Sequence, residues 1–390
     1  MLSGVKREGK RITLSTIHRM QALIDKKRVG RELANFTMDV VENQPPEKIR
    51  RITFVITRMV KFHGGQTSIL RLGTELAGLG YDVVYAVYKP QSREEMELCA
   101  ASNLKGYQGR MCTSKQFPSL KSDVFVASSW DTVSFVKKKN GYKMYFVQDY
   151  EPYFYSFGEL FLMAKKTYEM GLHMVSLGAW NKEMIEKNCR VVSAVDEIDF
   201  PYEKKEYPPV ERDYEGYARK KKLVFAVYLK YYGKRLPCVL QYMMKELAEC
   251  FREDGITLDV RYYGEAKSFH CEGGVNQGML NKEQLFALYK EADFGVVASM
   301  SNISLVPYEM IATGLPVIEF ADGTFPCFFP EGSGILTEIS GKDLYEKIKQ
   351  VLQEPERLGQ MQDRARSYMD GLSWGRSAAQ FQEILLNLRK

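Results

Sequence analysis

Short apolar runs alternate with longer amphipathic stretches from about residue 50 onward. The β-branched run over residues 51–58 predicts a buried parallel strand, and the apolar spacing over 67–79 predicts a helix. Further strands are predicted over 83–88, 124–127, 144–147 and 173–176. Strands that alternate with helices in this way are typical of a doubly wound α/β domain, which we expect over residues 50–195.

A second alternation of strands and helices follows a change of composition. Residues 196–222 are polar and interrupted by prolines, which is typical of a linker. Beyond them, strands are predicted over 223–229, 257–263 and 293–298, and helices over 236–251, 281–291 and 373–388. We therefore expect a second α/β domain over 223–371, and two such domains place a cleft between the carboxyl edges of their sheets.

Composition adds limits to this picture. The chain has 390 residues, of which 45% are hydrophobic and 27% charged, so it is long enough for two globular domains. Its seven cysteines are scattered without a C-x-x-C motif, which indicates reduced thiols in a cytosolic protein. The four histidines lie far apart in the sequence and give no local zinc signature. No uncharged apolar run approaches the roughly 20 residues that span a bilayer, and no secretory signal is expected.

Positive charge is concentrated in an N-terminal extension, residues 1–49. Residues 1–31 hold nine Lys or Arg against two acids, about +7 by count, whereas the whole chain is +6. Apolar residues recur among them at helical spacing: Ile12, Leu14, Ile17, Met20, Leu23 and Ile24. Two interpretations are open, a basic amphipathic helix on an anionic membrane surface or a solvated helix whose apolar side packs on the protein. A nucleic-acid partner is not expected, because such proteins more often spread basic charge over a folded domain.

The segment around Glu309 points to chemistry. A polar loop at Ser304 opens a helix that carries Glu309, and Gly314 ends it before a β-rich run over 317–320. The free backbone N–H groups and the dipole at such a helix N-terminus favour an anion, while Glu309 can accept hydrogen bonds from hydroxyl groups. A phosphate beside a sugar is the ligand that needs both.

Three cations lie in the predicted loop after strand 223–229, namely Lys230, Lys234 and Arg235. Cations at the carboxyl edge of a strand can neutralise a diphosphate leaving group, and they then stabilise the transition state more than the ground state. The alternative is a solvated basic loop.

Two loops of the first domain carry further candidates. Gly64 and Gly65 precede a predicted helix and allow a ligand to approach the backbone, although a plain tight turn has the same sequence. His63 beside them is either a proton carrier, an acceptor contact or a structural residue. Asp149 and Glu151 follow the strand over 144–147, so we expect both carboxylates to face the cleft. Asp149 is the first candidate to contact or activate the hydroxyl group of an acceptor substrate, as a general base if the reaction inverts configuration. A metal site and an acidic helix-capping turn are the alternatives for this pair.

The passage from Ser304 to Phe320 resembles the donor-binding helix of glycosyltransferases with the two-Rossmann GT-B fold, especially those of family 4. In this resemblance Glu309 is the second glutamate of the family pattern, Ser301 replaces the first, and Lys230 stands where arginine is usual. The implied catalytic residues are Asp149, Lys230, Lys234, Arg235 and Glu309. The implied donor-binding residues are Gly64, Gly65, Gly264, Ser304, Leu305, Val306 and Tyr308, and the acceptor candidates are His63 and Glu151.

A narrower resemblance concerns the sugar. Gly64-Gly65, the stretch over 148–153, the spacing of the three cations and Ser301 together are similar to bacterial rhamnosyltransferases of cell-wall or surface-layer polysaccharide assembly. This implies two Rossmann-like domains that face a central cleft, with residues 372–390 packed back on the first domain. It also implies a dTDP-rhamnose donor, a lipid-linked glycan acceptor, no metal or other cofactor, and a location on the cytoplasmic face of the plasma membrane.

Other functions fit the same sequence. A nucleotide-sugar 2-epimerase would split and re-add the nucleotide in a similar cleft, and it would need no acceptor. A non-catalytic partner subunit of the same fold is suggested by the missing first glutamate. A dinucleotide oxidoreductase is not expected, because no predicted strand is followed by G-x-G-x-x-G.

Overall fold

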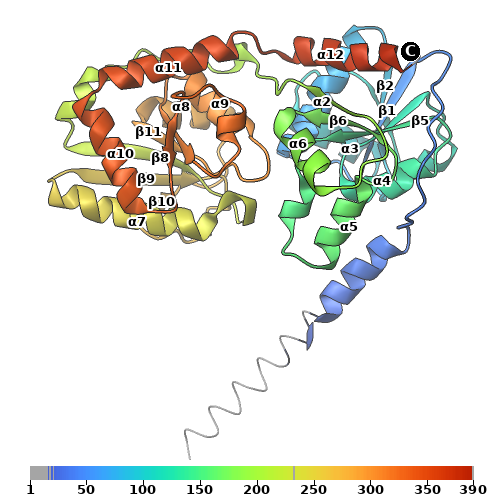
Figure 1. Cartoon of the computed structure of the whole chain (residues 1–390), viewed down its shortest axis with the longest axis horizontal. Helices are drawn as coiled ribbons and strands as arrows, with labels where there is room; N and C mark the ends of the chain where they lie inside the picture. The colour runs from blue at the N-terminus through green and yellow to red at the C-terminus, as the bar shows by residue number, and fades with distance from the viewer. Residues whose placement is uncertain (1–15, 17–18, 21, 232, 389–390) are drawn as a thin grey trace, which may run out of the picture.

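Two α/β domains lie side by side in the computed structural model, which describes residues 16, 19–20, 22–231 and 233–388 (Figure 1). Each domain is built on one parallel sheet with helices on its faces. Most of the central strands are buried on both faces, and for this reason they read as continuous apolar runs in the sequence. In the first strand, for example, every residue after Arg51 is buried.

The first domain contains a seven-stranded sheet in the order β3-β2-β1-β4-β5-β6-β7. Its strands are β1 (Arg51–Ile56), β2 (Asp82–Val87), β3 (Arg110–Cys112), β4 (Val124–Ala127), β5 (Tyr142–Val147), β6 (His173–Leu177) and β7 (Val195–Ile198). Its helices are α2 (Gly64–Gly78), α3 (Arg93–Asn103), α4 (Trp130–Lys137), α5 (Glu159–Thr167) and α6 (Ala179–Asn188), with short 3-10 turns η1 (Phe117–Ser119) and η2 (Glu151–Phe154).

The second domain contains a six-stranded sheet in the order β10-β9-β8-β11-β12-β13. Its strands are β8 (Lys222–Tyr228), β9 (Thr257–Tyr263), β10 (Val275–Asn276), β11 (Phe294–Val296), β12 (Val317–Phe320) and β13 (Ile335–Thr337). Its helices are α7 (Pro237–Glu253), α8 (Lys282–Glu291), α9 (Leu305–Ala312), α10 (Gly341–Gln353) and α11 (Glu356–Met369), with 3-10 turns η5 (Gly233–Arg235) and η6 (Phe325–Cys327).

Both sheets reverse their winding direction next to their first strand. In the first sheet β1 pairs in parallel with both β2 and β4, and in the second β8 pairs with both β9 and β11. The carboxyl edge at such a reversal is where doubly wound sheets open a crevice for ligands. The prediction of two doubly wound α/β domains is confirmed.

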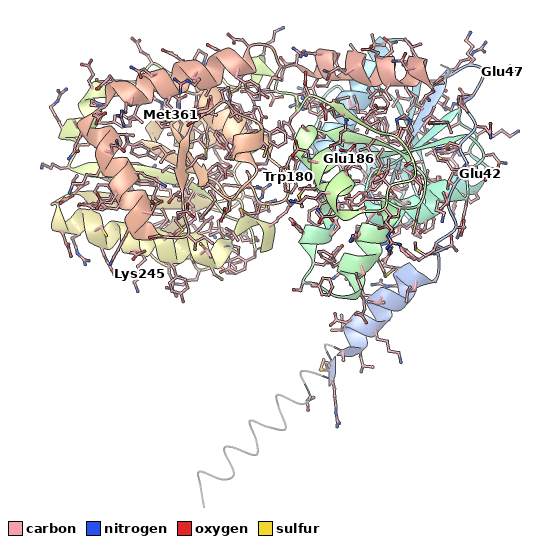
Figure 2. All side chains as sticks on the ribbon, in the orientation of Figure 1. Glu42, Glu47, Trp180, Glu186, Lys245 and Met361 are labelled. Carbon is pink, nitrogen blue, oxygen red and sulfur yellow. The ribbon has the colours of Figure 1, made fainter. Side chains whose placement is uncertain are left out.

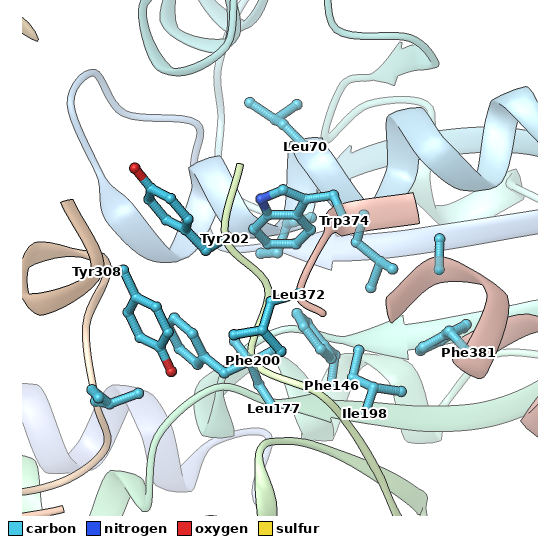
Figure 3. Packing of buried hydrophobic residues seen from close by; sticks show 14 of the residues in the cluster. Leu70, Phe146, Leu177, Ile198, Phe200, Tyr202, Tyr308, Leu372, Trp374 and Phe381 are labelled. Atoms are coloured by element: carbon cyan, nitrogen blue, oxygen red, sulfur yellow. The ribbon is translucent and has the colours of Figure 1, made fainter. Parts of the chain in front are cut away.

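The segment that joins the domains packs tightly between them. It runs over 199–221 and contains the 3-10 turns η3 (Lys204–Glu206) and η4 (Glu215–Arg219). Phe200 and Tyr202 stack on Tyr308 of α9, with ring centroids 5.1 and 6.0 Å apart (Figure 3). Aromatic pairs of this kind contribute about 0.5–1.5 kcal/mol beyond the area they bury, so the segment joins the domains and also stabilises their contact.

The last helix returns to the first domain. Helix α12 (Trp374–Asn387) follows α11 and lies across the first domain, where it packs on α2 and β7 (Figure 1). Phe381 meets Phe146 of β5 edge to face, with centroids 6.5 Å apart. Gln380 accepts a hydrogen bond from the backbone N–H of Asp199 at 2.9 Å. The chain therefore crosses between the domains a second time.

A helix before the first strand protrudes from the first domain and is described without interruption over 22–33 (Figure 1). The side chains of Met20, Leu23 and Ile24 are 59%, 67% and 57% exposed. For these three, the structure does not show the packing on the protein body that one interpretation predicted; Ile12, Leu14 and Ile17 lie outside the described residues. Within the described part of the chain, no helix has the length and apolar character that crossing a membrane requires.

Candidate active site

A carboxylate from the first domain meets a lysine and a hydroxyl from the second. Asp149 follows β5, and its Oδ1 lies 3.0 Å from Lys234 Nζ in the loop between β8 and α7. Ser301, in the loop between β11 and α9, donates a hydrogen bond to the same oxygen at 2.8 Å. Three of the loops at the carboxyl edges of the two sheets therefore converge on one oxygen atom.

Backbone groups fix the same meeting point. The N–H of Tyr150 donates to the carbonyl of Ser301 at 3.1 Å. The side-chain Nδ2 of Asn302, a residue only 1% exposed, donates hydrogen bonds to the backbone carbonyls of Gln148 and Leu177 at 2.6 and 3.1 Å. Because buried polar groups need such partners, these bonds hold the loop after β5 against the loop before α9.

The Lys234 side chain is largely buried, with 20% of its surface exposed. Burial lowers its pKa, the nearby Arg235 charge lowers it further, and the Asp149 carboxylate acts in the opposite direction. The ammonium also lies 4.2 Å from the centre of the Phe154 ring. A desolvated cation of this kind needs an anionic partner, and a diphosphate can take that place as well as a carboxylate can.

His63 lies in the same electrostatic neighbourhood. Although His63 is exposed at the surface, desolvation by neighbouring protein atoms lowers the pKa of its imidazole. The positive charges of Lys230 and Lys234 lower this pKa further. It caps α2, and its Nδ1 accepts a hydrogen bond from the Gln66 N–H at 3.3 Å. The neutral ring then carries its proton on Nε2, which suits donation to a phosphate or hydroxyl oxygen.

The glycines after His63 differ in their surroundings. A Cβ on Gly64 would meet no atom within 4 Å, so open space lies beside the backbone at the start of α2. A Cβ on Gly65 would lie 3.4 Å from both Gln148 Oε1 and His63 Cε1. The Gln148 side chain thus reaches from the loop after β5 to the beginning of α2.

The N-terminus of α9 presents polar groups without side-chain capping. Ser304 is the N-cap, but its side chain makes no capping hydrogen bond, and among the described residues its buried Oγ has no partner. Leu305 and Val306 in the first turn are half-buried. The first backbone N–H groups of a helix have no intrahelical acceptor, so this end of α9 can receive an anion.

Glu309 forms a second cluster one turn further along α9. Burial raises its pKa to about 7, while Arg71, a hydrogen bond from Tyr289 and Lys282 counteract this rise. The Tyr289 hydroxyl donates to Glu309 Oε2 at 3.4 Å. Its carboxyl group therefore changes charge near neutral pH and can accept or donate hydrogen bonds to hydroxyls.

Arg71 is a residue that sequence reasoning missed. It lies on α2 eight positions after His63, about 12 Å along a helix. Its guanidinium forms an ion pair with Glu206 of the connecting segment and approaches Glu309 closely enough to lower that pKa. The signal in the sequence is a single arginine within the apolar run from Ile69 to Leu72, where a charge needs a partner.

Three predicted site residues point elsewhere. Arg235 is only 7% exposed, and its Nη1 donates to the carbonyl of Ala298 at 2.9 Å, inside the second domain. The Tyr308 side chain is fully buried in the aromatic contact with Phe200 (Figure 3). Gly264 has φ +103°, and a Cβ there would come 2.7 Å from the Tyr228 ring, so its backbone approaches a side chain of its own domain.

Glu151 also lies in the interior of the first domain. It is 4% exposed and accepts hydrogen bonds from the Trp130 N–H at 2.7 Å and the Tyr145 hydroxyl at 2.9 Å. Burial raises its pKa to about 8. Of the two carboxylates expected to face the cleft, Asp149 lies at the junction of the domains, whereas Glu151 points into the interior and links the loops after β4 and β5. A contact of Asp149 with an acceptor stays a prediction.

The loop after β5 continues into aromatic residues. Tyr153 meets Tyr150 edge to face and lies 6.4 Å from the centre of the Trp180 ring on α6. Figure 2 shows Trp180 on the side of the first domain that faces the second.

Within the described residues, no group of three or more His, Cys, Asp or Glu side chains is placed to hold a metal ion, and metal independence stays a prediction.

Comparison with known proteins gives one match in sequence and several in structure. No protein-family model matches the chain. A stretch of 288 residues, 68% of the chain, is 25% identical to the O-antigen biosynthesis protein RfbC of Myxococcus xanthus. The match covers 21% of that protein, so the chain spans about a fifth of the length of this relative.

Solved structures match over both domains. Sucrose-phosphate synthase of Thermosynechococcus elongatus is 16% identical, with a TM-score of 0.63, over 87% of this chain and 99% of that one. Anabaena HepE, solved in complex with UDP-glucose, is 12% identical, with a TM-score of 0.66, over 86% of this chain and 99% of that one. The chain has the GT-B fold. In this GT-B chain, Lys234 and Ser301 follow β8 and β11, the two strands at the winding reversal of the second sheet, and they contact Asp149 of the loop after β5.

Proposed function

We propose that this chain is a glycosyltransferase that moves a sugar from a nucleoside diphosphate to a hydroxyl group of a bacterial polysaccharide. The observation that carries the proposal is the meeting of Asp149, Lys234 and Ser301 between the two sheets, next to the uncapped end of α9. The GT-B fold and the similarity to an O-antigen biosynthesis protein support the same reaction class.

The donor would be held mainly by the second domain. Lys230 and Lys234 supply positive charge, and the first N–H groups of α9 supply hydrogen bonds to the diphosphate. In this account the diphosphate replaces Asp149 as the partner of Lys234. Glu309, whose pKa is about 7, would contact hydroxyls of the donor.

Release of Lys234 leaves the Asp149 carboxylate ready to act as a base. In an inverting reaction it takes the proton of the acceptor hydroxyl, whose oxygen forms a bond to the anomeric carbon. The bond between that carbon and the diphosphate oxygen breaks, and its electron pair leaves with the diphosphate. The Nε2–H of neutral His63 can donate to a phosphate or sugar oxygen during this step.

For the donor and acceptor themselves, we propose dTDP-rhamnose and a lipid-linked glycan, with no metal required. The support is the motif set of the sequence, in which Lys230 and Ser301 depart from the commoner pattern. A UDP-sugar is the competing donor, and donor specificity follows directly from the assay below.

Contact with a membrane surface would suit a lipid-linked acceptor. The exposed Leu23 and Ile24 lie on a helix rich in lysine and arginine, the composition that binds anionic lipid surfaces. The Arg28 guanidinium of this helix lies 5.4 Å from the centre of the Tyr155 ring, and Phe157, two positions after Tyr155, is 82% exposed. We propose that this side of the first domain faces the cytoplasmic leaflet.

The test is a transfer assay with purified protein, a panel of nucleotide sugars that includes dTDP-rhamnose and UDP-glucose, and polysaccharide precursors as acceptors. We expect nucleotide release and sugar incorporation that EDTA does not change and that Asp149→Asn lowers by at least a hundredfold. Epimerised product from donor alone would identify an epimerase instead. Nucleotide binding without turnover on any acceptor would identify a partner subunit.

A further inference from the structure

A cavity lies at the carboxyl edge of the first sheet, among residues other than those around Asp149. It has a volume of about 140 Å³ and is bounded by the loops after β2 and β4, by α4, and by residues 31–36 of the N-terminal extension. Since one water needs roughly 10–15 Å³ measured in this way, the cavity has room for about ten waters, which is the scale of one sugar ring.

The lining combines aromatic rings with polar groups. Tyr88 and Phe135 stack with ring centroids 3.8 Å apart, and Trp130 lies beside them in the wall. Glu32, Asn35 and Asp131 bring carboxylate and amide oxygens into the same space. A sugar ring has apolar C–H faces and a rim of hydroxyls, so it matches a pocket of aromatic surfaces with a few fixed polar groups.

The polar part of the wall is held in place. Asp131 Oδ2 accepts hydrogen bonds from Thr57 Oγ1 at 2.6 Å and from the Tyr88 hydroxyl at 2.8 Å, and its Oδ1 accepts one from Ser129 Oγ at 2.5 Å. A carboxylate has about four acceptor sites, so Asp131 keeps about one of them, on Oδ1, for a hydroxyl of a ligand. Burial and the charge of Asp131 raise the pKa of Glu32 on the opposite wall, while Lys89 and Arg31, which also line the cavity, act in the other direction.

The wall formed by the extension is fastened to α4. Lys138 donates to Asn35 Oδ1 at 2.9 Å, and Lys137 donates to the carbonyl of Thr37 at 2.7 Å. Further along, the N–H of Val41 donates to the carbonyl of Met170 at 2.9 Å. The cavity is thus formed before a ligand arrives, which lowers the entropic cost of binding.

We propose that this cavity binds one sugar unit of a glycan. The position at the carboxyl edge of the first sheet, the aromatic pair, the three oxygen-bearing side chains and the fastened wall together carry the assignment. Trp130 connects the cavity to the loop after β5. Its backbone N–H donates a hydrogen bond to Glu151 Oε2, and Glu151 lies two residues beyond Asp149. Only the further step, that the glycan is the acceptor and extends from this sugar toward Asp149, rests on the proposed function.

The experiment uses ¹⁹F NMR of the full chain labelled with 5-fluorotryptophan. The chain has three tryptophans, which give three signals that single Trp→Phe variants assign. We expect methyl glycosides of rhamnose, glucose, galactose or N-acetylglucosamine to shift the Trp130 signal in a saturable way. Asn35→Phe, which fills the cavity, should raise the half-saturation concentration at least tenfold. Asn140→Phe, at an exposed turn after α4, should leave it unchanged.

Two results would overturn the proposal: a Trp130 signal that none of the glycosides shifts, or an Asn35→Phe variant that binds as the unchanged chain does. The cavity and the reaction fail separately. Glycoside binding in a chain that transfers no sugar would keep the cavity assignment and remove the acceptor role. Transfer activity without any Trp130 shift would keep the enzyme and remove the cavity.

Discussion

Lys234 and Asp149 form an ion pair across the junction of the two domains. The two lie 85 positions apart in the sequence and on different domains, yet their charged atoms are 3.0 Å apart. An ion pair that is only partly exposed stabilises little by itself, because desolvation offsets the attraction. Its value in our account is positional: it keeps a lysine and a base together until the diphosphate separates them.

We predict that Lys234→Ala lowers turnover by about 10²–10³-fold, because the charge that develops on the leaving diphosphate loses its nearest cation. The measurement is the steady-state rate with saturating donor and acceptor. Lys245→Ala is the matched control, since Lys245 is exposed on α7 far from the junction (Figure 2). Unchanged turnover in Lys234→Ala would remove the phosphate role from this lysine.

Glu151 gives a prediction about pH and stability. Its pKa is about 8 in the folded chain and near 4.5 when exposed, so between these values the folded state holds a proton that the unfolded state releases. The stabilising contribution of this group is therefore complete at low pH and is lost as the pH rises through 8. The side chain at this position in Glu151→Gln is neutral at every pH. We therefore expect the Tm of this variant, relative to the Tm of the unchanged chain, to rise between pH 5 and pH 9.

The comparison is made by thermal melts at several pH values, with Glu186→Gln as control. Glu186 is exposed on α6, so its variant should follow the unchanged chain at every pH. A constant difference between Glu151→Gln and the unchanged chain across this range would contradict a buried, protonated Glu151.

Residue roles were only partly predictable from sequence. Asp149, Lys230 and Lys234 follow predicted strands of the two domains, and a cleft was expected between the carboxyl edges of the two sheets. The direction of a side chain is a different matter. Glu151 lies two positions after Asp149 and points into the core, while Arg235 follows Lys234 and donates to Ala298. Spacing in the chain does not determine such choices, because packing partners from distant segments decide them.

Helix α9 is the decisive element, and its C-terminal end is as well defined as its N-terminal end. Gly314 has φ +75°, its N–H donates to the carbonyl of Ile311, and the N–H of Leu315 donates to that of Met310. This is the Schellman arrangement, in which a left-handed residue ends the helix. It fixes the distance between the N-terminus of α9 and the following strand β12.

Gly314→Ala should therefore destabilise the chain. A left-handed conformation costs an L-residue about 1–2 kcal/mol, and the new Cβ would lie 3.1 Å from the carbonyl of Val210. We expect a fall in Tm of about 2–8 °C in thermal melts. In Gly78→Ala, at the end of α2, the new Cβ would meet no atom within 4 Å, so that variant should be neutral or slightly stabilising. Equal Tm values for both would contradict this account of the α9 terminus.

Elements were more predictable than residues. The strand over 124–127 lies where the apolar run predicted it, because a buried parallel strand carries an uninterrupted signal. The strand over 257–263 also matches its predicted range, although Asp259 and Arg261 interrupt its apolar residues. Helix α2 begins at Gly64, earlier than the predicted residue 67. Glycine lowers helix propensity, and the cap that His63 provides to Gln66 outweighs this local preference.

At the scale of the whole molecule, the chain crosses between the domains twice, once through the segment over 199–221 and once between α11 and α12 (Figure 1). Composition predicted the first crossing as a linker, but the buried Phe200 and Tyr202 show that it also forms part of the packed junction. Because prolines and charged residues dominate the composition of that segment, the packing of its aromatic residues was not predicted. A motion of one domain against the other would have to preserve or exchange these contacts.

The N-terminal helix provides a second test at this scale. Leu23→Glu should weaken binding to vesicles that contain phosphatidylglycerol by about tenfold, because one apolar side chain no longer enters the lipid. Leu386→Glu on α12 is the matched control, since Leu386 and Leu23 are 64% and 67% exposed. Cosedimentation measures both variants. Equal binding of the two would contradict a membrane contact through this helix.

Our proposal requires that the junction of the two domains binds a sugar nucleotide through Lys234 and the α9 N-terminus. Its most direct test is calorimetric titration of dTDP, UDP, GDP and ADP into the purified chain, with and without EDTA. Our account predicts saturable binding of dTDP that EDTA leaves unchanged and that Lys234→Ala weakens at least tenfold. Absence of binding by all four nucleotides would contradict it.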